Sequence, residues 1–287
     1  MRAVVRPAAY VLSDLSLRWY RNPKRFAVIA AHARSGSSLL SHLLKAHPDF
    51  AGCVESFTEY VRPEDRRVLH RKICRENWRP WVREPWLFDK ANHLQFFPPA
   101  ALDTMQPDRL VLLLREPVRS LESMVSYFGR HRPEGFPEER AVRYYERRLE
   151  ELLVLAEKAD AGGIPILILE YDFLVEHRQE ALTALTEFFG LLEPFRDHYS
   201  TDRLQGETGD QSANIFKGTV GRTPRHEASL SQAVLRRGEK AFACARTALR
   251  TNNGRVLLSE MKTSKGFADT KGQFDAEPRW MERRGDS

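Results

Sequence analysis

The chain has 287 residues, of which 42% are hydrophobic and 29% are charged, and its formal net charge is +6. This length suffices for one large α/β domain, or for two small ones, with a sizeable hydrophobic core. The positive charge suits an anionic ligand, but the sequence contains no long basic tract, so nucleic acid is not expected as a partner.

The cysteines and the hydropathy also limit the class of protein. Cys53, Cys74 and Cys244 are widely spaced and form no C-x-x-C pair, so a structural zinc site is not expected. We interpret them as reduced thiols in a reducing compartment, which predicts a cytoplasmic location. No stretch approaches the ~20 consecutive apolar residues of a membrane-spanning helix, so a soluble protein is expected.

The two ends of the chain differ from its middle. Residues 1–20 are mildly apolar but are interrupted by Arg6, Asp14 and Arg18, which makes a poor signal peptide. We expect a short amphipathic helix there, within an N-terminal extension of residues 1–25. From Thr263 onward the composition is polar, so residues 263–287 are expected to form a loosely ordered tail. Residues 1–262, extension included, are expected to form a single domain.

A repeated pattern in the middle of the chain indicates the fold class. Three times, a short apolar run is followed by a polar turn and then by a segment with helical apolar spacing. The apolar runs are residues 26–31, 110–114 and 164–169, and the helical segments are residues 39–45, 118–128 and 179–189. Near-continuous apolar strands are typical of a parallel sheet covered on both faces. The repetition predicts a doubly wound α/β fold.

Other segments are less regular. Residues 62–92 are rich in Trp and Arg, and residues 201–226 are rich in Gly, Ser, Thr and Arg, which indicates a loop or lid. Residues 140–159 are expected to form a long charged helix, and residues 230–249 a further helix.

The turn at residues 32–38 suits an anion. In an α/β sheet, ligands bind where the carboxyl ends of strands meet helix N-termini, and this turn occupies such a junction. The glycine allows close backbone approach, the serine amides and hydroxyls can converge on an anion, and the arginine adds a planar cation. The candidate ligands are Arg34, Ser35, Gly36, Ser37 and Ser38.

This turn lacks the pattern of ATP-binding loops. A nucleotide kinase or ATPase would require G-x-x-x-x-G-K-[ST], whereas the turn has one glycine and no lysine before Ser37 or Ser38. The residues that bind magnesium and clamp a γ-phosphate are therefore missing. A plain alternative stays open, in which a turn of small residues merely starts a helix.

A second polar cluster follows the next apolar run. Arg115 lies at the tip of the predicted strand, Pro117 suits the first turn of a helix, and Ser123 lies about two turns along that helix. Arg115 and Ser123 can together bind a second anionic group. Alternatively, Arg115 pairs with a neighbouring carboxylate and Ser123 is only a residue of the helix surface.

These clusters resemble the motifs of sulfotransferases that use 3′-phosphoadenosine 5′-phosphosulfate (PAPS). Residues 34–38 resemble the 5′-phosphosulfate loop of that family, and residues 115–123 resemble its 3′-phosphate motif. Three further segments agree in order with family motifs: residues 89–98 with D-K-x-P-x-H…F-P, residues 170–174 with Y-E-D-L, and residues 217–222 with K-G-x-x-G. The resemblance covers about residues 26–221 and is closest to the carbohydrate and tyrosylprotein branches, which carry Arg in the first loop.

The chain also departs from the family pattern. Ala91 or Asn92 stands where a proline is expected after Lys90. Tyr171 is followed by Asp172 rather than by Glu-Asp, so that alignment can slip by one residue. The transmembrane anchor of Golgi relatives is not expected here.

The resemblance implies a P-loop-like, doubly wound parallel sheet flanked by helices, with PAPS as donor and no metal. Residues 50–55 are expected to form a short second strand that ends in Glu55. The resemblance implies that Arg34 and Lys90 stabilise the leaving phosphate and that Glu55 deprotonates the acceptor. Glu59 is the reserve candidate for the base. The alternative for Glu55 is an ion pair with Arg34. The implied cofactor-binding residues are Arg34, Ser35, Gly36, Ser37, Ser38, Arg115, Ser123, Tyr171, Lys217, Gly218 and Arg222.

The acceptor is expected to be a carbohydrate, a lipid or another small molecule with a hydroxyl or an amine. The residues that could line its site, by stacking on rings and attracting anions, are Trp78, Arg79, Trp81, Arg83, Trp86 and Arg130. Alternatively, the tryptophans belong to the core and the arginines to the surface. Two other functions stay open: a small-molecule kinase of the P-loop class, and a catalytically silent relative that binds PAPS or its product. The sequence predicts no oligomeric state.

Overall fold

A computed structural model describes residues 24–77, 81–130, 135–200, 215–221, 229–250 and 254–257. The predicted N-terminal helix and the tail at residues 263–287 fall outside these residues, apart from Lys24 and Arg25 of the extension.

The described part of the chain contains a six-stranded sheet with the strand order β2-β3-β1-β4-β5-β6, in which every neighbouring pair is parallel. The strands are β1 (Arg25–Ala31), β2 (Phe50–Gly52), β3 (Trp86–Ala91), β4 (Arg109–Leu114), β5 (Ile166–Glu170) and β6 (Arg255–Leu257). The predicted parallel α/β sheet is confirmed. The three apolar runs of the sequence form β1, β4 and β5, in that order.

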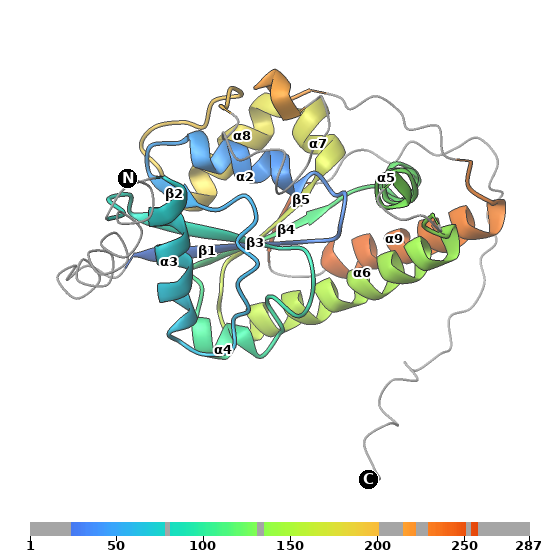
Figure 1. The fold of residues 1–287 in the computed structure, drawn as a ribbon, viewed down its shortest axis with the longest axis horizontal. Coiled ribbons are helices and arrows are strands. Elements are labelled where there is room, and N and C mark those ends of the chain that lie inside the picture. Colours follow the sequence, from blue (N-terminus) through green and yellow to red (C-terminus); the bar gives the residue numbers. More distant parts are fainter. Residues whose placement is uncertain are drawn as a thin grey trace, which may run out of the picture.

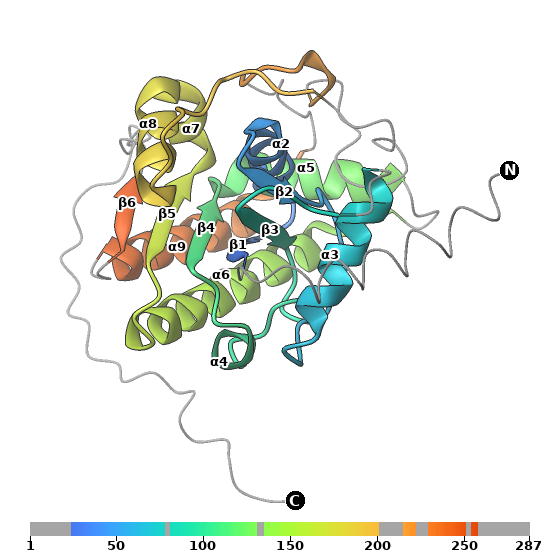
Figure 2. The same cartoon turned by 90° about the vertical axis from the view of Figure 1, so that its left-hand side faces the viewer.

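Helices cover both faces of this sheet (Figures 1 and 2). The helices are α2 (Ser37–Ala46), α3 (Asp65–Glu76), α4 (Ala101–Met105), α5 (Pro117–Arg130), α6 (Glu138–Ala161), α7 (Tyr171–Glu176), α8 (Arg178–Phe189) and α9 (Gln232–Arg250), with a 3-10 helix at Ile215–Lys217. Apolar residues of α2, α7 and α8 pack on one face, and those of α3, α4, α5, α6 and α9 pack on the other. The doubly wound arrangement is therefore also confirmed.

The alternation of side chains along β1 explains the two cores. Phe26, Val28 and Ala30 belong to the core under α6 and α9, whereas Ala27 and Ile29 belong to the core under α2 and α8. Successive side chains of a strand point to opposite faces, so a central strand that is apolar throughout supplies both cores.

The strand order reverses direction between β1 and β4, and we call the place outside the carboxyl ends of these two strands the crevice. From β1 the chain runs through α2 to β2 and β3 on one side, and from β4 it runs towards β5 and β6 on the other. The two adjacent strands are thus followed by helices on opposite faces, α2 after β1 and α5 after β4. Ligands of open α/β sheets bind at such a switch point, outside the carboxyl ends of the strands.

A buried arginine of α6 binds the ends of two strands. Arg148 donates from Nε to the carbonyl oxygen of Ala31 and from a terminal nitrogen to that of Ala91, both at 3.0 Å. Its other terminal nitrogen donates to Glu151 at 3.0 Å. The last carbonyl groups of β1 and β3 are therefore held by one guanidinium, next to the crevice.

We expect the change Arg148→Met to lower the free energy of unfolding by about 3 kcal/mol, because it leaves two buried carbonyl groups without donors. The neighbouring change Arg147→Met is the control: that side chain is 76% exposed and also pairs with Glu151. It should cost less than about 0.5 kcal/mol. Urea unfolding of both variants measures the difference, and equal losses would mean that Arg148 does not hold the strand ends.

Candidate functional site

The turn after β1 has a backbone that requires glycine. Arg34 and Gly36 both adopt left-handed conformations, with φ of 63° and 91°. A Cβ atom on Gly36 would lie 2.2 Å from Cδ2 of Tyr171, so the turn and this ring are in close contact. Gly36 directly precedes α2, whose first amides have no partner within the helix. The predicted turn between strand and helix is therefore present, and it presents backbone donors at the crevice.

Arg115 lies at the end of β4 beside this turn. It is only 6% exposed, and its guanidinium lies 4.3 Å from the ring centre of Tyr171. One terminal nitrogen donates to the carbonyl oxygen of Arg34 at 3.1 Å. Its buried Nε has no hydrogen-bond partner among the described residues, and no described carboxylate forms an ion pair with it. The alternative of an Arg115–carboxylate pair is therefore wrong for the described part of the chain.

Arg34 contacts the helix that follows β4. Its Nε donates to Oγ of Ser123 at 2.9 Å, and its guanidinium lies 4.6 Å from the ring centre of Tyr127. The structure thus brings together two residues that the sequence assigned to opposite ends of the donor, Arg34 to the leaving phosphate and Ser123 to the 3′-phosphate. Ser123 is buried, so its reading as a residue of the helix surface is wrong.

Lys90 and Glu55 form an ion pair next to the turn. Parallel pairing places Lys90 of β3 beside Ile29 of β1, close to the end of both strands. Nζ of Lys90 donates to Oε1 of Glu55 at 2.8 Å and to Oγ of Ser38 at 3.2 Å. The side chain of Lys90 is 1% exposed and that of Glu55 is 22% exposed. The ion pair of Glu55 is therefore with Lys90 and not with Arg34. The predicted strand end at Glu55 is wrong, because β2 ends at Gly52 and Glu55 lies in the loop that follows.

Two further predicted residues differ in their surroundings. Oγ of Ser37 is buried and donates to Oδ1 of Asn92 at 3.0 Å. Glu59 is exposed, and it forms no ion pair with a described residue. Of the two carboxylates named as the base, only Glu55 contacts Lys90.

The residue that precedes Lys90 in β3, Asp89, carries a buried carboxylate. Oδ2 of Asp89 accepts hydrogen bonds from the hydroxyl groups of Ser56 and of Tyr60, the latter at 2.7 Å, and Oδ1 accepts one from the backbone N–H of Lys90 at 2.9 Å. Burial raises the pKa of Asp89 to about 6. Sequence reasoning gave Asp89 no role. The available signal was an acidic residue within the otherwise apolar run that precedes Lys90.

His32 joins β1 to β4 as a neutral side chain. Its Nε2 accepts a hydrogen bond from the backbone N–H of Arg115 at 3.1 Å, so Nδ1 carries the proton and donates to the carbonyl oxygen of Ala33 at 2.9 Å. Burial lowers the pKa of His32 to about 4. The imidazole is therefore uncharged near neutral pH.

Helix α6 supplies two further supports that the sequence did not indicate. The hydroxyl of Tyr144 accepts from the N–H of Ala33 at 3.0 Å and donates to the carbonyl oxygen of Asn92 at 2.9 Å. The hydroxyl of Tyr145 donates to the carbonyl oxygen of Arg115 at 2.7 Å. The buried face of a helix predicted only as long and charged thus fixes three loops of the site.

The segment 215–221 lies against the same site through Tyr171. The hydroxyl of Tyr171 lies 3.5 Å from the carbonyl oxygen of Gly221, at the edge of hydrogen-bonding distance. This segment contains the predicted residues Lys217 and Gly218, whereas Arg222 lies outside the described residues.

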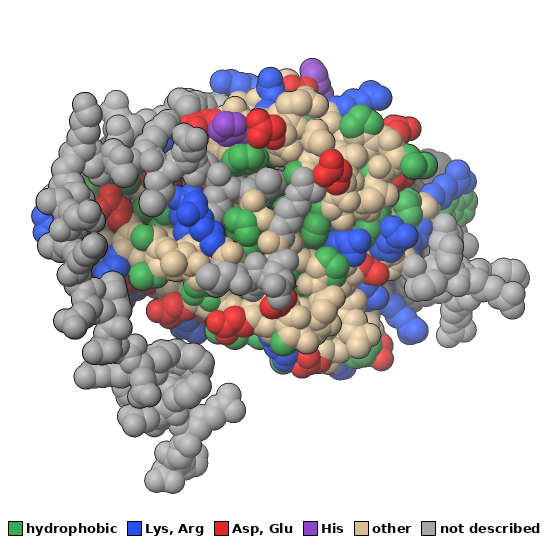
Figure 3. All heavy atoms as spheres, turned by 180° about the vertical axis from the view of Figure 1, so that it is seen from behind, with side chains coloured by type: hydrophobic (Ala, Val, Ile, Leu, Met, Phe, Trp, Pro, Cys, Tyr) green, Lys and Arg blue, Asp and Glu red, His purple; other side chains and the backbone are tan. Residues whose placement is uncertain are grey.

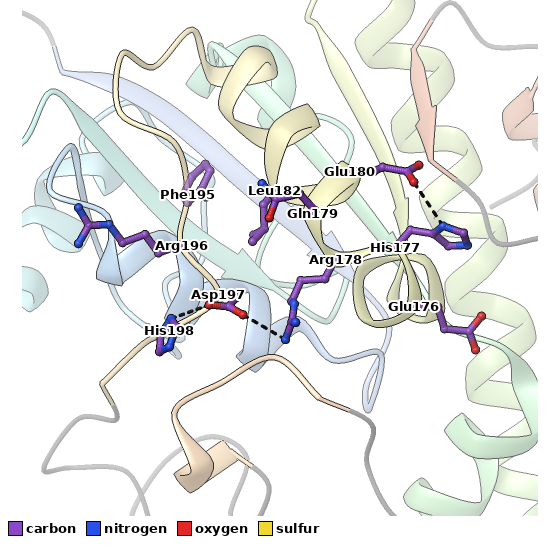
Figure 4. Close-up of a pocket in the computed structure, with 10 residues that line it drawn as sticks. All are labelled: Glu176, His177, Arg178, Gln179, Glu180, Leu182, Phe195, Arg196, Asp197 and His198. Atoms are coloured by element: carbon purple, nitrogen blue, oxygen red, sulfur yellow. Dashed lines mark ion pairs between the residues drawn. The ribbon is translucent and has the colours of Figure 1, made fainter.

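An ionic cluster at the start of α8 anchors this segment (Figure 4). Asp197 lies between Arg178 and His198, at 3.1 Å and 2.5 Å, and its carbonyl oxygen accepts from the N–H of Val220 at 3.1 Å. Arg178 also donates to the carbonyl oxygen of Val220 at 3.2 Å. Arg178, Asp197 and His198 line a pocket that the sequence did not indicate.

The described residues among those expected to line an acceptor site have different surroundings. Trp86 is buried and stacks against Phe50, so its expected role at an acceptor site is wrong and its core alternative is right. Trp81 is an exposed side chain whose ring lies 5.5 Å from the guanidinium of Arg83. Arg130 is exposed at the end of α5, and Trp78 and Arg79 lie outside the described residues.

Charge and hydropathy give further findings about the described residues. Acidic and basic side chains are interspersed on the face opposite to that of Figure 1 (Figure 3). Within the described ranges, no group of three or more His, Cys, Asp or Glu residues could hold a metal ion. No described helix is long and apolar enough to cross a membrane.

Comparisons with known proteins give similarities at the level of three-dimensional structure only. No model of a known protein family matches the chain, and no curated protein does. A sulfotransferase domain from the curacin biosynthetic pathway is similar over 76% of this chain and 98% of its own, with 15% identity and a TM-score of 0.45. Mouse sulfotransferase SULT7A1 complexed with PAP is similar over 84% of this chain and 93% of its own, with 13% identity and a TM-score of 0.49. At these values, neither similarity assigns a role to a residue of this chain.

The close contact between the turn and Tyr171 can be tested with alanine. Gly36→Ala should lower the free energy of unfolding by about 3 kcal/mol, because the methyl group adds a clash with the ring to the cost of a left-handed backbone. Gly163 is the matched control, since its φ is 67° and a Cβ there would meet no atom within 4 Å. Gly163→Ala should cost only about 1 kcal/mol. Equal losses in urea unfolding would contradict the contact.

Proposed function

We propose that this chain transfers a sulfuryl group from PAPS to a hydroxyl or amine of a carbohydrate, a lipid or another small acceptor. The observation that carries the proposal is the buried Arg115, whose Nε has no partner among the described residues. A guanidinium stays charged at any working pH, and a buried charge without a partner is costly, so an anionic ligand is the natural partner. The five sequence motifs that resemble those of PAPS-dependent sulfotransferases identify which anion.

The residues of the crevice fit a donor with two anionic ends. Oγ of Ser35 is another buried donor that has no partner within the described part of the chain, and it lies in the turn itself. Residues 35–38 would hold the 5′-phosphosulfate through their amides, with the hydroxyls of Ser37 and Ser38. Arg115 and Ser123 would hold the 3′-phosphate, with Lys217, Gly218 and Arg222 closing over it. Tyr171 would line the adenine.

The chemistry then rests on Glu55, Lys90 and Arg34. Glu55 would take the proton of the acceptor hydroxyl while the acceptor oxygen bonds to sulfur and the bond from sulfur to the bridging oxygen breaks. Lys90 would neutralise the leaving phosphate oxygen and could donate a proton to it. This role of Lys90 is supported by the position of its ammonium group, which contacts both Glu55 and Ser38 of the turn. Arg34 would add charge without giving up a proton.

The proposal also covers the metal requirement, the partners and the cellular location. A sulfuryl group carries less charge than a phosphoryl group, so side-chain cations and amides can replace the metal of phosphoryl transfer, and we propose that no metal takes part. A small-molecule or glycan acceptor, no nucleic-acid partner and a cytoplasmic location, all expected from the sequence, belong to the same proposal.

The central experiment compares two donors. Transfer of label from PAPS in an acceptor mixture without magnesium, with a gain of one sulfuryl group by mass spectrometry, would establish the activity. Magnesium-dependent transfer from ATP would instead identify a kinase. Binding of PAPS without transfer to a broad panel of acceptors would identify a silent relative.

Glu55→Gln should reduce turnover by about 100-fold or more, because a general base contributes about that factor. Affinity for the product 3′-phosphoadenosine 5′-phosphate (PAP), measured by calorimetry, should change little. Glu59→Gln, at the exposed second candidate, separates the two carboxylates. Turnover like that of the wild type in Glu55→Gln, with the loss in Glu59→Gln, would reverse the assignment.

Arg115→Ala should weaken the binding of PAP by about 100-fold, because a charge-assisted contact to phosphate is lost. The binding of AMP, which lacks the 3′-phosphate, should weaken far less. Arg119→Ala, in the first turn of the helix that follows Arg115, removes a cation paired with Glu116 and controls for the change in net charge. Equal losses for both nucleotides in calorimetry would show that Arg115 does not read the 3′-phosphate.

A further inference from the structure

One buried carboxylate, Asp89, accepts hydrogen bonds both from the residue that follows the candidate base and from the backbone of the candidate lysine. Ser56 follows Glu55, and its hydroxyl donates to Oδ2 of Asp89. Lys90 follows Asp89, and its backbone N–H donates to Oδ1 of the same carboxylate at 2.9 Å. The two oxygens of Asp89 therefore connect Ser56, the sequence neighbour of Glu55, with the backbone of Lys90.

The segment that carries Glu55 is not part of a regular element of secondary structure. Residues 53–60 form neither helix nor strand, so hydrogen bonds of a regular element do not fix them. Nζ of Lys72, from α3, donates to the carbonyl oxygen of Ser56 at 2.5 Å and to Oγ1 of Thr58 at 3.0 Å. Ser56, Thr58 and Asp89 are all buried. The segment is thus fastened to β3 and α3 by a small polar network with Asp89 at its centre.

We infer that Asp89 is a positioning residue, which sets the contact between Lys90 and Glu55 by bridging Ser56 and the backbone of Lys90. The inference rests on the proposed function, and it adds a residue to the catalytic apparatus without giving it a contact to substrate. Transfer in line requires the base to be held in a narrow range of positions, and a shift of 1 Å can cost a factor of about 100. A buried carboxylate with two fixed oxygens supplies that restraint where regular secondary structure does not.

The chain offers a matched pair of variants for the test. Ser56→Ala and Tyr60→Phe each remove one hydroxyl donor from the same oxygen, Oδ2 of Asp89. Tyr60→Phe should lower stability by about 1 kcal/mol, as for the loss of one hydrogen bond, and Ser56→Ala by more, because the hydroxyl of Ser56 also contacts the hydroxyl and the N–H of Thr58. Of these two residues, only Ser56 is directly bonded to Glu55 along the chain. We therefore expect kcat to fall by about 10- to 100-fold in Ser56→Ala, with KM and PAP affinity nearly unchanged.

Tyr60→Phe should keep kcat within about twofold of the wild type, because Asp89 keeps its hydrogen bonds to Ser56 and to the backbone N–H of Lys90. Asp89→Asn should share the kcat loss of Ser56→Ala, which excludes the hydrogen bond between Ser56 and the N–H of Thr58 as its cause. Equal kcat in Ser56→Ala and Tyr60→Phe would overturn the inference, whether or not Asp89→Asn folds.

Crystal structures of the two hydroxyl variants give a readout that does not depend on turnover. In Ser56→Ala, Nζ of Lys90 and Oε1 of Glu55, which lie 2.8 Å apart in the native chain, should separate beyond hydrogen-bonding distance, and in Tyr60→Phe they should not. An unchanged distance in Ser56→Ala refutes the positioning role. Failure of the wild type to bind PAP or use PAPS refutes the proposed function instead, and the two results are distinguishable.

Discussion

The site depends on three parallel strands that end at the same edge of the sheet. Because β3, β1 and β4 are neighbours, Lys90, the turn at residues 32–38 and Arg115 emerge side by side. Buried hydrogen bonds from outside the sheet hold this edge, since Arg148 binds the last carbonyl groups of β1 and β3. Without that alignment, the loop, the lysine and the second arginine would be unrelated parts of the sequence.

The cations of the site are buried in different ways. Lys90 is paired with Glu55 and also contacts a serine of the turn, so its charge is compensated within the protein. Arg115 contacts a carbonyl oxygen and the face of Tyr171 but no described carboxylate. A paired cation suits proton and charge transfer at the reacting end of a ligand, whereas a cation that forms no ion pair with a described residue suits a fixed anion. This contrast supports the assignment of the two ends of the donor.

The sequence predicted the parts of the fold that follow from local patterns. Apolar runs predicted β1, β4 and β5, and the single glycine predicted the turn that only a left-handed residue completes. It did not predict β3 as a strand, because Asp89 and Lys90 interrupt its apolar run and acquire partners only through tertiary contacts. Nor could it pair Arg34 with Ser123 or find the tyrosines of α6, since such contacts join residues far apart in the chain.

His32 shows how a titratable group can be withdrawn from chemistry. It begins the turn that carries the candidate donor site, where a histidine would ordinarily be suspected of acid–base catalysis. Here both ring nitrogens are committed to backbone partners of opposite kind, and protonation would set two donors against each other. With a pKa of about 4, the ring keeps one charge state through the range in which cells work. The His32 side chain therefore connects two strands in a way that does not change with pH over that range. Proton transfer at the crevice is left to Glu55 and Lys90.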